Sequence, residues 1–143
     1  MTKDNLVSKD RSTAIEAKNG QEQHFYQPPE DVLSKFIDAW TRCDWEEMAN
    51  NCQLSWVTAI DDPTEALRGL FQYKPLKIEV ESVKEYDGLV YVARMKITAS
   101  IARGVTQERV VEARLLCESA PLQPSRDGLW GVNPLSLYNK VKE

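Results

Sequence analysis

The chain has 143 residues, of which 42% are hydrophobic and 28% are charged, with a formal net charge of −4. This length and composition are typical of a single globular domain and argue against a disordered chain. No apolar run approaches the ~18 residues that a membrane-spanning helix needs, so no membrane association is expected. Lys and Arg are scattered among acids, which leaves no continuous positive surface for a nucleic acid. The first thirty residues lack the apolar stretch of a secretory signal, and the expected location is the cytoplasm.

The cysteine and histidine content gives no support for a metal site. Cys43, Cys52 and Cys117 include no CxxC pair, and the single histidine, His24, is far from them in sequence. A structural zinc site needs about four such ligands at close spacing, so we expect neither a metal nor another cofactor. Cys43 and Cys52 could pair in an oxidising compartment, although free and partly buried thiols are the favoured interpretation.

The N-terminal segment 1–29 is polar, mixed in charge and nearly free of large apolar residues until Phe25 and Tyr26. Such a segment buries too little surface to offset its ordering entropy. We predict a flexible tail over 1–29 and a single domain over 30–143. His24 is expected to be a solvated side chain of this tail rather than a catalytic base.

Three helix-type segments follow the tail. A proline pair followed by acids starts the first helix near residue 30. Its apolar stripe has the i, i+3, i+4, i+7 spacing: Leu33, Phe36, Ile37 and Trp40. Asp44 begins the second helix with the capping-box spacing to Glu47, and the third begins at Asp62 and ends before Pro75. Residues 53–60 fit either a strand or a continuation of the second helix.

The period of the apolar residues then changes from helical to twofold. The predicted strands cover 76–86, 89–101, 105–118 and 130–138. Asp87 and Gly88 between the first two give a strong hairpin signal. Pro134 has no N–H to donate to a ladder, so the last strand is expected at an edge or a bulge. The predicted fold class is α+β, with three N-terminal helices packed on a curved antiparallel sheet of about four strands.

Three stretches carry a resemblance to a known family: VLSKFIDAW at 32–40, CDWEEMA at 43–49 and DGLWGV at 127–132. Together with the order of helices before sheet, they make the segment 30–138 resemble the nuclear transport factor 2-like superfamily, which includes ketosteroid isomerases and scytalone dehydratases. The resemblance implies a cystatin-like cone, with the first helix across the concave side of the sheet and a cavity at the open end. Members use this cavity for catalysis or for ligand binding, and many pair through the convex sheet face.

Alternation along the strands places few ionisable groups on the side that should face the helices. The expected members of this side are Leu76, Ile78, Val80, Leu89, Tyr91, Ala93, Met95, Ile97, Ala99, Val111, Ala113, Leu115 and Cys117, with Arg109 as the main exception. Enzymes of the family need an acid or histidine base and a proton donor inside the cone. Asp44 has a sufficient capping role and Asp38 lies off the apolar stripe. We therefore expect no catalytic residue, unless a bulge reverses the alternation.

Several large side chains are suited to line the mouth of such a cavity and to hold a small apolar ligand. The candidate ligand-binding residues are Trp40, Trp56, Tyr73, Tyr91 and Met95. Core packing alone is the alternative for each of them.

The opposite face of the predicted sheet is not wholly polar. Val90, Val92, Val110, Leu116, Trp130 and Val132 are expected to point outward. An apolar patch among charges indicates an interface, and we predict a homodimer formed sheet to sheet. The alternative is that the N-terminal tail or a bulged register covers the patch within one chain.

Three functional interpretations remain open. The favoured one is a non-catalytic domain that binds a small apolar ligand or a protein partner, as a dimer. The second is an isomerase, dehydratase or cyclase that acts on a hydrophobic substrate. The third is an assembly subunit of a secretion-type complex, although such domains normally follow a transmembrane helix.

Overall fold

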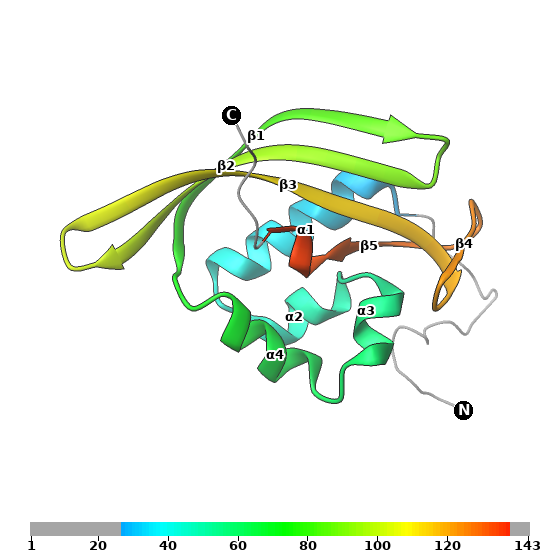
Figure 1. Ribbon diagram of the computed structural model, residues 1–143, viewed down its shortest axis with the longest axis horizontal. Coiled ribbons are helices and arrows are strands. Elements are labelled where there is room, and N and C mark those ends of the chain that lie inside the picture. Colours follow the sequence, from blue (N-terminus) through cyan, green and yellow to red (C-terminus); the bar gives the residue numbers. More distant parts are fainter. Residues whose placement is uncertain (1–26, 138–143) are drawn as a thin grey trace.

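The computed structural model describes residues 27–137 as a helical segment followed by an antiparallel sheet (Figure 1). The helices are α1 (Pro29–Thr41), α2 (Trp45–Asn50), α3 (Leu54–Ala59) and α4 (Pro63–Leu70), and the strands are β1 (Pro75–Tyr86), β2 (Val90–Ala102), β3 (Val105–Ala120), β4 (Gln123–Pro124) and β5 (Leu129–Asn133), followed by the 3-10 helix η1 (Pro134–Leu137). None of the described helices is long and apolar enough to cross a membrane. Most of the predicted tail, with His24, lies outside the described residues.

Proline and carboxylate side chains set the helix starts, as predicted. Pro29 occupies the first turn of α1, where the missing N–H of proline costs nothing. The Asp44 carboxylate accepts a hydrogen bond from the backbone N–H of Glu47 (3.2 Å) and caps α2. Asp62 caps α4 in the same way through the N–H of Glu65 (3.2 Å).

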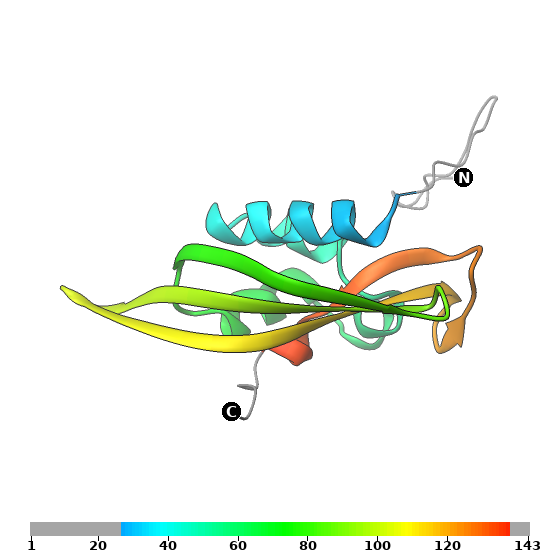
Figure 2. The same cartoon turned by 90° about the horizontal axis from the view of Figure 1, so that it is seen from above.

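The strands β1, β2 and β3 form an antiparallel meander, and β5 pairs with the other edge of β3. The predicted hairpin joins β1 to β2 through Asp87 and Gly88, whose φ values of 54° and 69° are those that a type I′ turn requires. The short β4 pairs with the end of β3. Strands β2 and β3 extend past the helices as a projecting hairpin (Figures 1 and 2).

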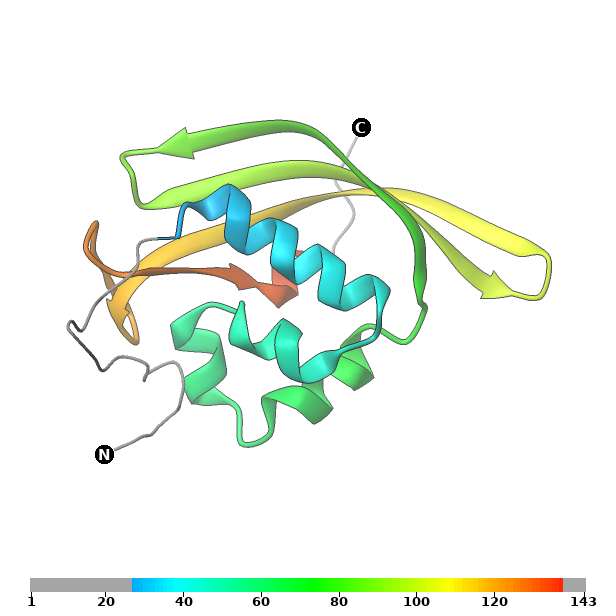
Figure 3. The same cartoon turned by 180° about the vertical axis from the view of Figure 1, so that it is seen from behind.

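The predicted architecture of three helices on a four-stranded cone is wrong. Residues 27–137 contain four short α-helices and five strands, and the ambiguous segment 53–60 forms the separate helix α3. Only α1 lies across a face of the sheet, whereas α2, α3 and α4 lie beyond the β5 edge (Figure 3).

The position of these three helices follows from a backbone connection to β5. The N–H of Gln53 donates to the carbonyl oxygen of Val132 (2.7 Å), and the N–H of Val132 donates to the carbonyl oxygen of Asn51 (2.8 Å). Cys52 forms a parallel bridge with Val132 between them. This connection, which we call the seam, ends α2 and holds the helical group at the sheet edge instead of over the concave face.

Strands β2 and β3 alternate as predicted and bury one face, which we call the inner face. Its fully or almost fully buried members are Tyr91, Ala93, Met95, Ile97, Val111, Ala113, Leu115 and Cys117. In β5, Val132 pairs with Leu115 and Trp130 pairs with Cys117, so both β5 residues lie on the inner face and are buried. The prediction that Trp130 and Val132 point outward is therefore wrong, because pairing with β3 sets the parity of this short strand.

Strand β1 departs from simple alternation. Its register shifts between Val80 and Ser82, so Glu85 lies opposite Tyr91 on the inner side. Leu76 and Val80, expected on the covered side, are 59% and 46% exposed. Within the described part of the chain β1 pairs with β2 alone, so its other edge has no neighbouring strand.

Two glycines are expected to respond in opposite ways to alanine. A Cβ at Gly131 would overlap the backbone of Cys52 and Gln53 at the seam, so Gly131→Ala should lower the free energy of unfolding by about 1–3 kcal/mol. Gly69 in α4 has open space where a Cβ would stand, so Gly69→Ala should raise it by about 0.5–1 kcal/mol. Urea denaturation measures both changes. An unchanged midpoint for Gly131→Ala would contradict the close backbone approach at the seam.

Candidate functional site

The inner face of the sheet is open where the β2–β3 hairpin leaves the core. A space of about 300 Å³ lies there, bounded by the end of α1, by the end of α4 with the residues after it, and by β2 and β3. It is lined by Trp40, Gly69, Leu70, Phe71, Gln72, Tyr73, Ile97, Ala99, Ile101, Gln107 and Arg109. We call this space the hollow.

Trp40 is the central aromatic residue of the hollow. Its ring packs against Phe71, with centroids 4.9 Å apart and planes tilted by 55°, and edge-on against Phe36 at 6.2 Å. The Trp40 side chain is almost fully buried, yet its indole Nε1–H has no hydrogen-bond acceptor among the described residues. A buried donor without an acceptor costs about 1–3 kcal/mol, so native proteins leave few of them.

The polar residues of the hollow add one positive charge and no negative charge. Arg109 lies opposite Ile97 in the β2–β3 register and therefore belongs to the inner face, and Gln107 lies opposite Ala99 on the same side. Among the described lining residues there is no aspartate, glutamate or histidine. Arg109 is therefore the charged residue among the described lining residues.

The hollow brings together two of the five predicted ligand-binding residues. Trp40 and Tyr73 line it. Met95 is fully buried in the core, Tyr91 lies near the start of β2, and Trp56 lies on α3, so these three are not part of the lining.

Sequence reasoning missed some of the lining residues. Phe71 and Gln72 follow α4 in a connection that has neither a helical nor a twofold period, so no pattern indicated their position. Gln107 has the same parity as Arg109 on β3, and that signal was sufficient to find it.

Tyr91 belongs to a different part of the inner face. Burial raises the pKa of Tyr91, and the negative charges of Glu30 and Glu85 raise this pKa further. Glu85 reaches this position through the register shift of β1. The Tyr91 phenol therefore stays protonated well above neutral pH.

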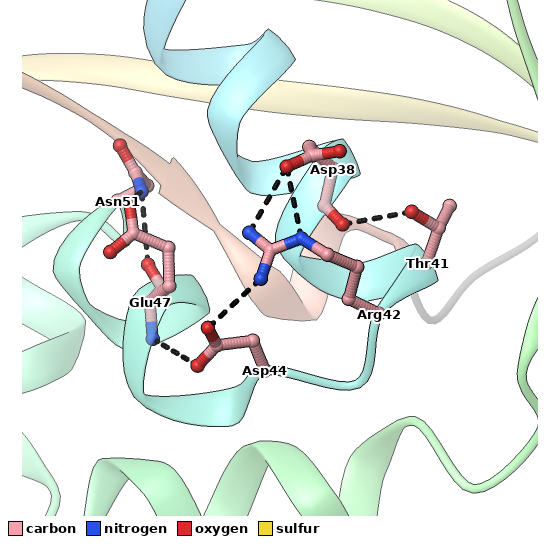
Figure 4. A network of polar contacts seen from close by, with 6 residues as sticks. All are labelled: Asp38, Thr41, Arg42, Asp44, Glu47 and Asn51. Atoms are coloured by element: carbon pink, nitrogen blue, oxygen red, sulfur yellow. Dashed lines mark hydrogen bonds and ion pairs between the residues drawn. The ribbon is translucent and has the colours of Figure 1, made fainter.

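The two acids considered from the sequence for catalysis form an exposed network at the α1–α2 corner (Figure 4). Arg42 donates from Nε to Asp38 (3.1 Å) and from Nη1 to Asp44 (3.1 Å). The hydrogen bonds with Asp38 first and Asp44 second raise the pKa of Arg42. Asp44 also caps α2. Both acids thus have structural partners at the surface, and neither lines the hollow.

None of the three cysteines, all of which are among the described residues, forms a disulfide. Cys43 is partly exposed, and Cys52 and Cys117 are buried. Burial raises the pKa of the Cys117 thiol, which makes it a poor nucleophile at neutral pH.

A buried carboxylate that sequence reasoning did not identify belongs to Glu118, which is 2% exposed. It accepts hydrogen bonds from the Gln53 amide (3.0 Å) and from the backbone N–H and hydroxyl of Ser55 (2.9 and 2.6 Å). These donors lie at the start of α3, which has no side-chain cap of its own. Glu118 therefore caps α3 from β3, and it does not line the hollow.

Glu118→Ala is expected to lower the free energy of unfolding by about 2–4 kcal/mol, because the donors at the start of α3 lose a charged acceptor. Glu108→Ala on the exposed part of the same strand is the control, with an expected change within about 0.5 kcal/mol. Urea denaturation compares the two variants. Equal midpoints would contradict the capping role of Glu118.

The other four residues predicted for a dimer interface lie on the outer face of the sheet. Val90 and Leu116 are paired neighbours, and Val92 and Val110 share their side; all four are partly exposed. Tyr86, paired with Val90 and 48% exposed, extends the same apolar row.

No protein-family model matches the chain, and no curated protein matches it. Two solved structures are similar in fold. A SEC-C motif containing protein from Rhodopseudomonas palustris has 13% identity and a TM-score of 0.56, over 73% of this chain and 74% of that one. A SEC-C motif containing protein from Psychrobacter arcticus has 10% identity and a TM-score of 0.59, over 85% of this chain and 68% of that one.

At these identities the similarity shows a shared fold alone. The SEC-C motif proteins belong to a different fold family from the nuclear transport factor 2-like proteins, so the resemblance drawn from the sequence is wrong, together with the cystatin-like cone that it implied. Order of elements misled the assignment, because helices followed by an antiparallel sheet occur in more than one fold.

Proposed function

We propose that the chain is a non-catalytic binding domain that holds a small, largely apolar molecule in the hollow. The observation that carries this proposal is the open space of about 300 Å³ on the inner face, walled by Trp40, Phe71 and Ile97.

The size and lining of the hollow favour a small ligand. Ligand sites are commonly about 300–1,000 Å³, and the hollow is at the lower end of this range. Phe71, Ile97 and Trp40 supply the apolar wall, and Arg109 and Gln107 supply the polar groups.

Binding is favoured over the isomerase, dehydratase or cyclase alternative by the chemistry of the lining. Proton abstraction needs a base near the substrate, usually a carboxylate or an imidazole. The described lining residues offer neither, and the buried Glu118 is occupied in capping α3.

Blocking the hollow should abolish binding. Ala99 lies on the inner face and lines the hollow, so Ala99→Phe should fill it, whereas Thr98→Phe adds the same ring on the outer face of the same strand. Screened against a panel of hydrophobic metabolites, the wild type should show a melting-temperature rise of at least about 5 °C for a ligand at ~100 times its Kd. The rise should disappear in Ala99→Phe and persist in Thr98→Phe. No shift with any compound, or a shift that survives in Ala99→Phe, would sink the proposal.

Self-association is a second proposal, supported by the apolar row of Tyr86, Val90 and Leu116 on the outer face and by Val92 beside it. Exposed apolar patches of this kind often mark contacts between proteins. Trp130 and Val132 are no longer part of this surface, since both are buried in the core.

Light scattering after size exclusion tests this interface. The wild type should be a dimer, and Val90→Glu should weaken the dimer by at least about tenfold, because it buries an unpaired charge between Tyr86 and Leu116. Thr98→Glu, on the same face away from the row, is the control and should leave the dimer intact. A wild-type monomer at high concentration would refute the interface.

A further inference from the structure

We propose that two copies of the chain pair through the free edge of strand β1, antiparallel to each other and about a twofold axis at the bulge of this strand. The partner is a second copy of this chain. The contact does not involve the hollow, and it differs from the outer-face row of Tyr86, Val90 and Leu116, because it uses the backbone of an edge strand.

Strand β1 has an uncovered edge. It has 12 residues and pairs with β2 alone among the described strands. Each residue of the segment 79–86 is exposed, including Val80 (46%) and Val83 (48%), which lie opposite Met95 and Ala93 on the inner side. The N–H and C=O groups of an unpaired edge are a template for another strand. A second strand would therefore satisfy these groups and cover two exposed valines.

The bulge makes the order of faces along β1 symmetric. Its register with β2 places one set on the outer side and another on the inner side, namely Lys77, Glu79, Ser82, Lys84 and Tyr86 outside and Ile78, Val80, Val83 and Glu85 inside. Glu81 is the extra residue of the bulge and lies near Arg94 of the outer face (3.7 Å). The segment 77–86 thus has the same succession of faces when it is read from either end.

This symmetry selects one register for two copies. Residues directly opposite each other in an antiparallel pair point to the same side of the sheet. All faces match when Glu81 of each copy lies opposite Ser82 of the other, because the two bulges then coincide. A shift by one or two residues in either direction places an inner residue opposite an outer one at the bulge.

The same register is complementary in charge and in apolar surface. On the outer side it places Lys84 of each copy opposite Glu79 of the other, and on the inner side it places Val80 opposite Val83. Each pair occurs twice because the contact is isologous. Opposite charges and β-branched residues are favourable cross-strand neighbours. A shift by two residues would instead place Lys77 opposite Lys84.

The contact is expected to be weak. It involves about ten residues a side, against the 20–30 of a standard interface. Bulges and charged side chains often prevent edge pairing, but in this register a second copy matches both. Each copy in an outer-row dimer keeps its β1 edge free. We therefore expect edge pairing at higher protein concentration than the outer-row dimer.

Single-cysteine variants test the register. Val80→Cys and Val83→Cys are made in a Cys43→Ser background, since Cys43 is partly exposed and Cys52 and Cys117 are buried. Neither variant should cross-link with itself, because equivalent positions are three residues, or about 10 Å, apart along the ladder and a disulfide cannot span that distance. An equal mixture of the two, under mild oxidation, should give at least about tenfold more disulfide-linked dimer on a non-reducing gel.

Charge exchange in the same mixture tests the pairing of Lys84 with Glu79. Lys84→Glu in both chains should lower the yield of linked dimer by at least about threefold, because like charges then lie opposite each other. Glu79→Lys in one chain with Lys84→Glu in the other should restore the yield. Arg103→Glu, between β2 and β3 and outside the paired segment, is the control and should leave the yield unchanged. Circular dichroism melts establish that each variant is folded.

The outcomes separate edge pairing from the proposed function. Val90→Glu in both chains should leave the cross-link intact, since Val90 lies on β2 and not at the free edge. No cross-link in the mixture, or as much in either variant alone, would overturn edge pairing and leave the hollow and the outer-row contact standing. A cross-link that Val90→Glu abolishes would also refute it, because the outer-row contact would then be its source.

Discussion

The fold depends on the seam, where the backbone of residues 51–53 joins the edge strand β5. Two hydrogen bonds, from Gln53 to Val132 and from Val132 to Asn51, connect segments about eighty residues apart in the chain. Gly131 permits this approach, because any larger residue would meet the Cys52 backbone. The seam turns the helical segment away from the sheet after α2, so α1 alone is left to cover the inner face (Figure 3).

This arrangement explains where the hollow lies. One helix of 13 residues covers only part of the long strands β2 and β3, which continue beyond it as a hairpin. At the seam end the inner face is closed by Trp130 and Val132, and Glu118 holds α3 against β3. At the other end, Phe71 and the end of α1 reach the sheet without filling the space above Ala99 and Arg109, which both line the hollow.

Sequence alone predicted the features that depend on local chemistry. The caps at Asp44 and Asp62, the turn at Asp87 and the alternation of β2 and β3 all follow from neighbouring residues, and all are confirmed.

Three features depend on pairing between distant segments, and the sequence did not predict them. The parity of β5 is set by β3, the side on which Glu85 lies is set by the β1 bulge, and the break after α2 is set by the seam. Trp40 and Tyr73 were found as lining residues because they are large and aromatic, whereas Phe71 occupies a connection with no period to interpret.

Trp40 is the residue of the hollow that core packing explains least. The ring of Trp40 packs against Phe36 and Phe71, yet its buried N–H has no acceptor among the described residues, which costs about 1–3 kcal/mol. Local departures from the most stable arrangement concentrate at functional sites, where binding compensates for them. Arg109 belongs to the same inner face, because it lies opposite Ile97 in the β2–β3 register, and it also lines the hollow. A buried indole N–H and a guanidinium on one inner face are costly for core packing, and this cost is in keeping with the binding function proposed for the hollow.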